Sequence, residues 1–244
     1  MEHAHGCPVH GHAPEGPQLE GTGATDYERY LHVDALLSLQ KDPKDMAHPD
    51  ELLFQTIHQS FELWLKLIHF ELDRIKEYLD KDDLYTAVRL LRRCRRAVEA
   101  NTKALLVFET MAPNDFHEVR RQLGNGSGAE SPGFRHLLAH APSVWPHVEA
   151  LLEREGETLD DIYLKAGHRS DLFALLEHMT DFDQCVSSWR AAHLNVVKRI
   201  IGRDVKSLKG YAVHQLEQDI RMTLWPALWK VRELVTEAEG TSPA

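Results

Sequence analysis

The stretch that decides the fold runs from residue 49 to residue 79 and reads PDELLFQTIHQSFELWLKLIHFELDRIKEYL. Large apolar side chains recur in it every three or four residues, at Leu53, Ile57, Phe61, Trp64, Ile68, Leu72, Ile75 and Leu79. This spacing predicts a long amphipathic α-helix with one apolar face. Proline suits the first turn of a helix, and acidic residues favour its N-terminal dipole. We therefore expect the helix to begin at Pro49, Asp50 and Glu51.

The same helical period continues through most of the chain. We expect further helices over residues 84–111, 134–140, 146–155, 171–201 and 208–238. Gly202 is a plausible C-cap for the fourth of these, and Pro226 interrupts the last. No segment has the strict alternation of a half-buried strand, and none is repeated. The sequence therefore predicts an all-α fold, a bundle of long antiparallel helices with short connections.

Two segments lack this pattern. Residues 1–24 contain four histidines, many prolines and glycines, and almost no large apolar groups, which indicates a disordered His-rich tail. A single helical domain would then span residues 25–240. Residues 124–133 read GNGSGAESPG, and we expect this segment to be an irregular loop outside any helix. Loops of this length in compact domains are often functional.

The composition excludes several classes of function. The chain has 244 residues, 43% hydrophobic and 27% charged, as in an ordinary soluble globular protein. A net charge of -10 disfavours nucleic acid and anionic membranes as partners. No apolar run approaches the roughly 20 residues of a membrane-spanning helix, and the N-terminus lacks the features of a secretory signal. With only three scattered cysteines, we expect a cytoplasmic protein without membrane or nucleic-acid partners.

His193 is the first candidate for chemistry, in the helix expected over residues 171–201. Apolar residues surround it at helical spacing: Val186, Trp189, Val196, Val197 and Ile200. Its imidazole should therefore point into the apolar interior. A buried histidine is usually a hydrogen-bonded core residue, but an imidazole held among apolar side chains is also typical of an axial heme ligand.

His58 is the second candidate, with Phe54 and Glu62 one turn away on either side. A neutral imidazole there could accept or donate a proton near a bound substrate. The alternative is a structural histidine that bonds to a neighbouring helix, and the spacing alone does not decide between the two.

Other metalloenzyme classes leave motifs that this chain lacks. A carboxylate-bridged di-iron bundle needs Glu-x-x-His pairs on two helices, whereas the one such pair here is Glu2 with His5, in the tail. The sequence has no His-Glu-x-x-His zinc motif, no phosphate-binding glycine loop and no nucleophile elbow.

Four blocks of sequence, in the right order, resemble the tryptophan 2,3-dioxygenase superfamily of heme proteins. They lie within residues 27–40, 50–66, 109–135 and 189–202. The second block, with HQSFELWLK at residues 58–66, and the fourth, with WR at residues 189–190, His193 and RIIG at residues 199–202, are the most specific. The resemblance implies that the helical bundle encloses a pocket for heme b, iron protoporphyrin IX.

The resemblance also implies roles for individual residues. His193 would be the proximal ligand of the heme iron, and Trp189 would bind the cofactor beside it. His58 would be the catalytic residue on the distal side, where it would hydrogen-bond the indole N–H of the substrate.

Four further residues would contact the substrate, an aromatic amino acid that reacts with O2. Phe54 would line the indole pocket, and Arg135 would pair with the carboxylate, which suits the two-pronged guanidinium. Tyr27 and Tyr30 belong to a segment that in the family reaches into the active site of a neighbouring subunit. The resemblance thus implies a homo-oligomer, either a dimer or a tetramer.

Two segments depart from the family pattern. Members carry a Gly-Thr-Gly-Gly-Ser loop after the ligand helix, whereas residues 203–210 read RDVKSLKG. Ala129 and Glu130 also replace the usual Phe-Gln pair. Both changes affect how substrate is held more than how heme is bound.

These departures leave more than one function open. We expect oxygenation of the indole C2–C3 bond of tryptophan, or of a substituted tryptophan, with O2. The alternative within the superfamily is a monooxygenase that hydroxylates tryptophan or tyrosine, with O2 or peroxide, in a natural-product pathway. An alternative of another class is a non-catalytic heme sensor, which the His-rich tail with Cys7 and Pro8 supports and the substrate-binding Arg135 disfavours.

Overall fold

The computed structural model describes residues 16–126, 128–165, 167–203 and 222–240, and every regular element in these residues is a helix. The all-α prediction is therefore confirmed. The chain divides into two compact units, residues 1–46 and residues 47–244. The boundary predicted at residue 25, between the tail and a single helical domain, stays a prediction.

The first unit contains three short helices, α1 (Asp26–Leu31), α2 (Val33–Leu37) and η1 (Pro43–Asp45). Thr25 caps α1 through a reciprocal pair of hydrogen bonds with Glu28. Residues 18–23, assigned above to the tail, are held against α1, because Asp26 accepts hydrogen bonds from two of their backbone N–H groups and Arg29 donates to two of their carbonyls. Neither α1 nor α2 has a buried residue.

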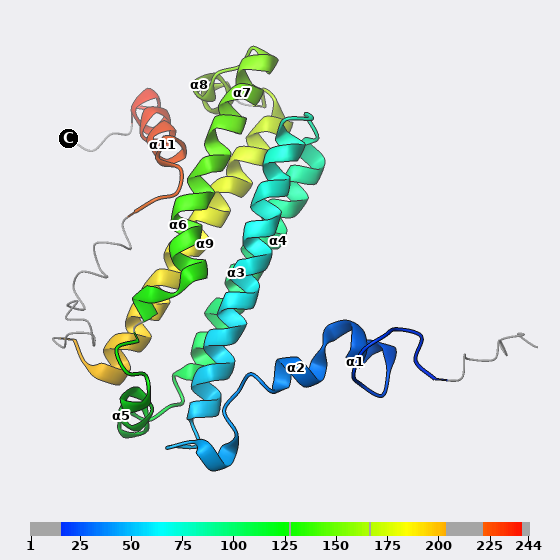
Figure 1. The fold of residues 1–244 in the computed structure, drawn as a ribbon. Coiled ribbons are helices and arrows are strands. Elements are labelled where there is room, and N and C mark those ends of the chain that lie inside the picture. Colours follow the sequence, from blue (N-terminus) through cyan, green and yellow to red (C-terminus); the bar gives the residue numbers. More distant parts are fainter. Residues whose placement is uncertain (1–15, 127, 166, 204–221, 241–244) are drawn as a thin grey trace, which may run out of the picture. The chain divides into compact units, whose positions relative to one another are not determined.

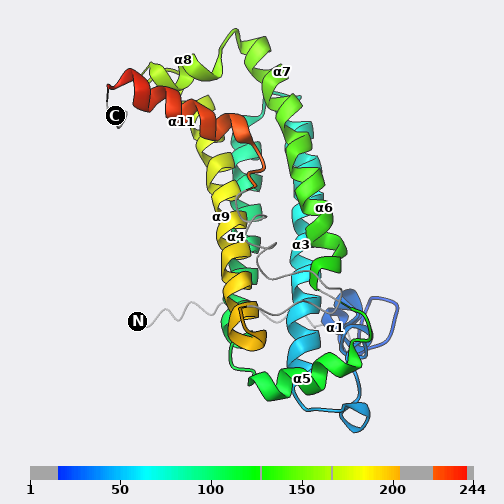
Figure 2. The ribbon, with the colours of Figure 1, turned by 90° about the vertical axis from the view of Figure 1, so that its left-hand side faces the viewer.

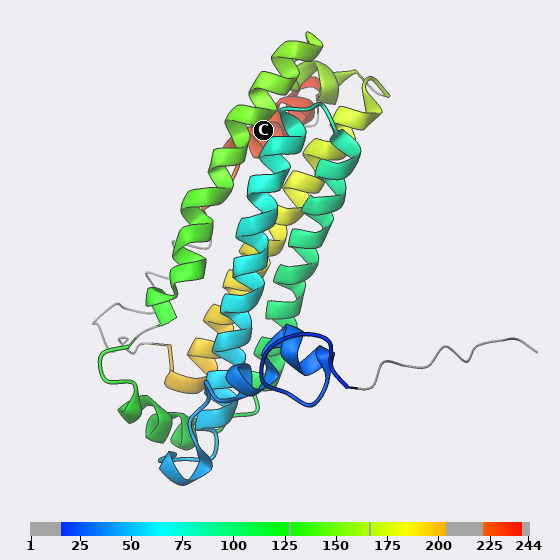
Figure 3. The same cartoon turned by 45° about the vertical axis from the view of Figure 1, so that its right-hand side comes forward.

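The second unit is built around three long helices that lie side by side, α3 (Glu51–Leu79), α4 (Leu84–Phe108) and α9 (Ser170–Ile201) (Figures 1 and 3). The apolar stripe of α3 faces this core, where Ile68, Leu72, Ile75 and Leu79 are fully buried. A four-residue connection reverses the chain between α3 and α4, and Asp83 caps α4 by accepting from the Thr86 N–H.

Charged side chains at the edges of the core tie the three helices together. Arg93 of α4 donates to Glu71 of α3, and Arg95 of α4 donates to Asp181 of α9. Cys94, between the two arginines, points into the core. Arg93, Arg95 and the neighbouring Arg96, which pairs with Glu99, are therefore all ion-paired.

A second layer runs along α3 and consists of α6 (Pro132–His140), η3 (Ala141–Val144) and α7 (Trp145–Glu155) (Figure 2). The expectation that Pro132 and Gly133 lie outside a helix is wrong, since they form the first turn of α6. Ser131 caps that turn through the Phe134 N–H, and proline is tolerated in a first turn because its missing N–H would be unpaired there.

The bundle is closed by shorter helices. The helix α5 (Pro113–Gln122), which was not predicted, lies at one end, and α8 (Leu159–Leu164) and α11 (Pro226–Ala238) lie at the other (Figure 2). Pro226 begins α11 instead of interrupting a longer helix, and residues 208–221 of the predicted helix lie outside the described residues. None of the described helices combines the length and apolar character that crossing a bilayer requires.

The buried carboxylate of Asp183 anchors α11 to α9. It accepts hydrogen bonds from the backbone N–H groups of Leu224 and Trp225, at 3.0 and 3.4 Å, and from the Trp229 indole at 2.8 Å. Because these donors satisfy the charge, the carboxylate can remain in the interior at 2% exposure.

Candidate active site

His193 lies on α9, within an aromatic cluster between α3, α6 and α9. Its ring is stacked on that of Trp189, with 5.6 Å between the centroids, and no residue of the described part of the chain hydrogen-bonds to it. Burial, with a smaller contribution from the nearby His58, lowers the pKa of His193 to about 4. The imidazole is therefore neutral, which is the form that binds a metal.

Trp189 joins His193 to the rest of the cluster. Its ring contacts Phe61 of α3 at 5.9 Å and Phe134 of α6 at 4.7 Å. The indole Nε1 is buried and has no hydrogen-bond partner in the described residues. Leaving such a donor unpaired costs about 1–3 kcal/mol. The site therefore has a donor that would favour a ligand carrying an acceptor.

His58 lies on α3, and aromatic rings surround it: Phe54 at 4.0 Å, Phe108 at 5.5 Å and Phe61 at 5.7 Å between centroids. Its Nδ1 lies 2.7 Å from the Phe54 carbonyl oxygen. A carbonyl can only accept, so Nδ1 must carry the proton and Nε2 is left as an acceptor. Burial lowers the pKa of His58 and so maintains this neutral form, although the Phe54 carbonyl and Glu62 act in the opposite direction.

Glu62, one turn after His58, holds the start of α6. Its carboxylate accepts from the Ser131 hydroxyl at 2.5 Å and from the Gly133 N–H at 3.0 Å. A side chain at residue 133 would come within 2.6 Å of Glu62 Oε2 and 2.9 Å of Leu65 Cβ, so the close approach requires glycine.

The contact between Gly133 and Glu62 fixes the positions of the next two residues of α6, Phe134 and Arg135. Phe134 packs on Trp189, and Arg135 is exposed, with no ion pair to any described residue. Gly128, which begins the short 3-10 helix η2 (Gly128–Glu130), lies beside His193, since a Cβ there would be 3.9 Å from Nε2. The glycine-rich segment and α6 thus belong to the same site as the two histidines.

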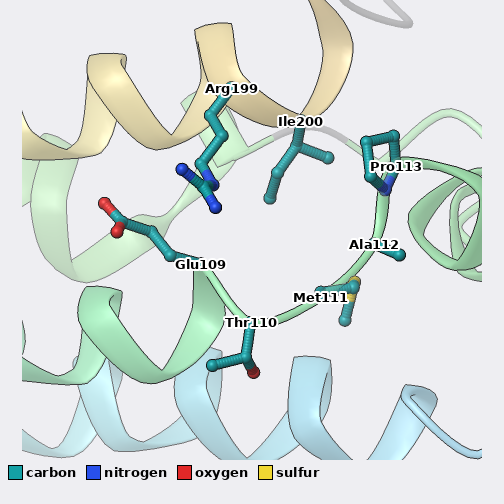
Figure 4. A pocket seen from close by; sticks show the side chains of 7 residues that line it. All are labelled: Glu109, Thr110, Met111, Ala112, Pro113, Arg199 and Ile200. Carbon is teal, nitrogen blue, oxygen red and sulfur yellow. The ribbon is translucent and has the colours of Figure 1, made fainter.

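A pocket of about 300 Å³ opens where α4 and α9 end, and it is lined by residues 109–113, Arg199 and Ile200. Figure 4 shows Arg199 of α9 and Glu109, the C-cap of α4, extending into the same space. The third and fourth blocks of the sequence analysis are distant in the chain and meet at this pocket.

Comparison with known proteins identifies the family to which this arrangement belongs. The sequence model of the tryptophan 2,3-dioxygenase family matches residues 12–140, more than half of the chain. The protein belongs to the tryptophan 2,3-dioxygenase family. It is 28% identical to tryptophan 2,3-dioxygenase 1 of Ralstonia nicotianae, over 94% of this chain and 95% of that protein. The tryptophan 2,3-dioxygenase of Bacillus thuringiensis is 27% identical over 84% of this chain and 91% of its own length.

Membership of the tryptophan 2,3-dioxygenase family implies a heme, and the residues present fit one. The cluster offers a neutral imidazole in His193, an unpaired indole donor in Trp189 and flanking phenylalanine rings. An imidazole in apolar surroundings is a common heme ligand, and apolar rings suit the faces of a porphyrin.

The structure brings together only some of the residues that the dioxygenase resemblance singled out. Phe54, His58, Trp189 and His193 are linked by ring contacts, directly or through Phe61. Tyr27 and Tyr30 belong to the first unit and are 71% and 75% exposed. Residues 204–210, which replace most of the family's Gly-Thr-Gly-Gly-Ser loop, lie outside the described residues. The positioning role of Glu62 was not predicted from the sequence. Its place one helical turn after His58 was the signal that could have indicated it.

Proposed function

We propose that this protein binds heme b through His193 and uses O2 to oxygenate the indole C2–C3 bond of tryptophan or of a substituted tryptophan. The observation that carries the proposal is the pairing of two neutral histidines, His58 and His193, in one aromatic cluster of a tryptophan 2,3-dioxygenase family member. When bound, the heme supplies the activation of O2.

The protein's own residues bind and orient the substrate. The Nε2 lone pair of His58 accepts the indole N–H, and the surrounding phenylalanine rings, Phe54 among them, pack against the indole faces. Closely packed aromatic side chains exclude water and fix the plane of the substrate's indole ring, so the indole carbons are held in one orientation for reaction with O2.

Arg135 binds the substrate carboxylate. It begins the second turn of α6 with its guanidinium exposed, and no carboxylate of the described residues forms an ion pair with it. The contacts of Glu62 with Ser131 and Gly133 fix the first turn of α6 and thereby the base of the arginine side chain.

The working form is a cytoplasmic homo-oligomer, a dimer or a tetramer. Tyr27 and Tyr30 are exposed, as are Leu31 and Leu37 of the same unit, and an exposed group of large apolar side chains is typical of an interface. In the oligomer, the two tyrosines complete the active site of a neighbouring subunit.

The second candidate function is monooxygenation of tryptophan or tyrosine, with O2 or peroxide. The observation that favours it is the RDVKSLKG sequence at residues 203–210, which lacks the glycines and threonine of the family loop. Mass spectrometry of products from each amino acid, with each oxidant, distinguishes the candidates. Two added oxygens on tryptophan support the dioxygenase, whereas one added oxygen on either substrate overturns it in favour of the hydroxylase.

Substitution of His193 tests the heme assignment, which both functions share. His193→Ala should purify without a Soret band. His147→Ala, which removes a histidine of α7 that pairs with Asp80, should retain the band. Stoichiometric heme in His193→Ala would contradict the ligand assignment.

Substitution of Arg135 tests the carboxylate assignment. Losing one partner of a close charge pair costs about 2–5 kcal/mol, so Arg135→Ala should raise KM at least about 30-fold with heme content unchanged. Arg121→Ala, on the exposed face of α5, is the matched control. An unchanged KM in Arg135→Ala would remove that residue from substrate binding.

A further inference from the structure

Three histidines form a second cluster, apart from the aromatic site. His69 comes from α3, and His136 and His140 lie one turn apart on α6. Each offers a ring nitrogen, and these three atoms lie within 4.8 Å of one another. The ring centroid of His69 is 4.3 Å from that of His136 and 5.4 Å from that of His140. Two residues one turn apart with a third from a facing helix is a common way to build a metal site.

The hydrogen bonds made by His69 and His140 leave a nitrogen lone pair on each ring, and these two lone pairs face each other. His69 Nε2 lies 2.9 Å from the Gly133 carbonyl oxygen, so it donates and Nδ1 is unprotonated. His140 Nε2 lies 2.8 Å from Asp73 Oδ1, and in a neutral ring donation there leaves its Nδ1 unprotonated as well. The two Nδ1 atoms are 3.2 Å apart. Two facing lone pairs at this distance repel each other unless a positive species lies between them.

Lys76 permits a different arrangement of protons. Its ammonium lies 3.1 Å from His140 Nε2 and 2.7 Å from Asp73. If Lys76 donates to Nε2, then His140 Nδ1 can carry a proton and donate it to His69. That arrangement needs no metal, but it leaves His136 without a role, because His136 is exposed and forms no hydrogen bond with any described residue.

We propose that His69, His136 and His140 bind a divalent transition metal ion, for which Zn²⁺ is the reference. Zinc binds imidazole nitrogen at about 2.0–2.1 Å, which places two ligand nitrogens of a tetrahedral site about 3.4 Å apart. The observed separation of the two Nδ1 atoms is already close to this value. Ligating histidines almost always donate their other N–H to a carbonyl or a carboxylate, as His69 does to Gly133 and His140 to Asp73.

The site would join α6 to α3 close to the heme pocket. Gly133, whose carbonyl holds His69, also donates its N–H to Glu62, and the next residues along α6 are Phe134 and Arg135. The metal therefore braces the helix that carries the proposed carboxylate ligand, without entering the active site itself.

Zinc binding to the full-length chain tests the proposal. The metal-binding side chains of the His-rich tail are first replaced, so that the tail cannot compete for the ion. The starting protein carries alanine or serine in place of the tail's own ligands, His3, His5, Cys7, His10 and His12. After equilibrium dialysis with Zn²⁺, this protein should retain one equivalent by elemental analysis and melt at a higher temperature than without zinc.

Variants in this background locate the ion. His136→Ala should lose the equivalent and the thermal shift, and because the side chain is exposed the fold should persist by circular dichroism. His147→Ala, which removes a histidine that pairs with Asp80, should keep both. Asp73→Asn should weaken binding about 10–100-fold. Absence of zinc from the starting protein, or equal zinc in His136→Ala and His147→Ala, would overturn the site.

Discussion

Replacing Glu62 with glutamine separates the placement of α6 from heme binding. The carboxylate accepts two hydrogen bonds, from Ser131 and from the Gly133 N–H, and it forms no hydrogen bond with His58 or His193. Hydrogen bonds to a charged group contribute about 1.5–3 kcal/mol each, against about 0.5–1.5 kcal/mol for neutral pairs. Glutamine keeps the shape but loses the charge and one acceptor, so the link between α3 and α6 should weaken by about 1–3 kcal/mol.

The loss should appear in substrate binding, because Arg135 follows directly on this turn. A free-energy change of 1.4 kcal/mol corresponds to a factor of ten, and Glu62 is half-buried, so we expect Glu62→Gln to raise KM about tenfold. Steady-state kinetics with tryptophan, at measured heme content, provide the assay. Glu77→Gln is the control, since Glu77 is exposed on the same helix and its side chain forms no hydrogen bond with any described residue.

A double-mutant cycle with Ser131→Ala identifies the cause. The two substitutions should be non-additive, because they remove the same contact. An unchanged KM in Glu62→Gln would refute the reasoning. So would a fall in activity that merely follows loss of heme, because Glu62 would then support the cofactor rather than the helix that carries Arg135.

Three other outcomes follow from buried groups. Asp183→Asn should lower the free energy of unfolding by about 2–3 kcal/mol in a urea titration of the apoprotein, because several N–H donors lose a charged acceptor; an unchanged midpoint would contradict this. Trp189→Phe removes the unpaired N–H together with the five-membered ring of the indole, so heme should transfer to an excess of apoglobin about 2–10-fold faster, and equal rates would argue against a donor role. Burial raises the pKa of Cys185 to about 11 and raises that of Cys94 further, so native protein at pH 8 should react slowly with a thiol reagent at Cys185 and only after unfolding at Cys94. Rapid native labelling of Cys94 would show that the core opens.

The helices could be predicted from the sequence because their cause is local. The apolar period located α3 and α9 to within one or two residues, and Gly202, with a positive φ of 95°, ends α9 as expected. The start of α6 was misjudged, because Ser131 capping and the close packing of Gly133 on Glu62 outweigh the usual tendency of glycine and proline to break helices. That outcome depends on a contact 71 residues away in sequence, which periodicity cannot detect.

The site was only partly predictable for the same reason. The orientation of the half-buried His193 toward the aromatic cluster followed from its helical neighbours, whereas the role proposed for His58 comes from family resemblance. The tautomer of His58, the unpaired Nε1 of Trp189 and the histidine cluster on α3 and α6 depend on how helices pack. The chain has sixteen histidines, more than is usual for its length, but nothing in the sequence singled out His69, His136 and His140 among them.

The bond between His58 and the Phe54 carbonyl determines which molecules the pocket can select. Because main-chain oxygen takes the only ring proton, the imidazole offers an acceptor to whatever enters, and no side-chain replacement at residue 54 can reverse that polarity. Indoles and phenols both satisfy it, whereas N1-methylindole or benzothiophene analogues of the same outline would leave the nitrogen unsatisfied. Discrimination between such isosteres therefore depends on a backbone carbonyl. Substitutions of residue 54 would change the shape of the pocket but not the acceptor that His58 presents to the substrate.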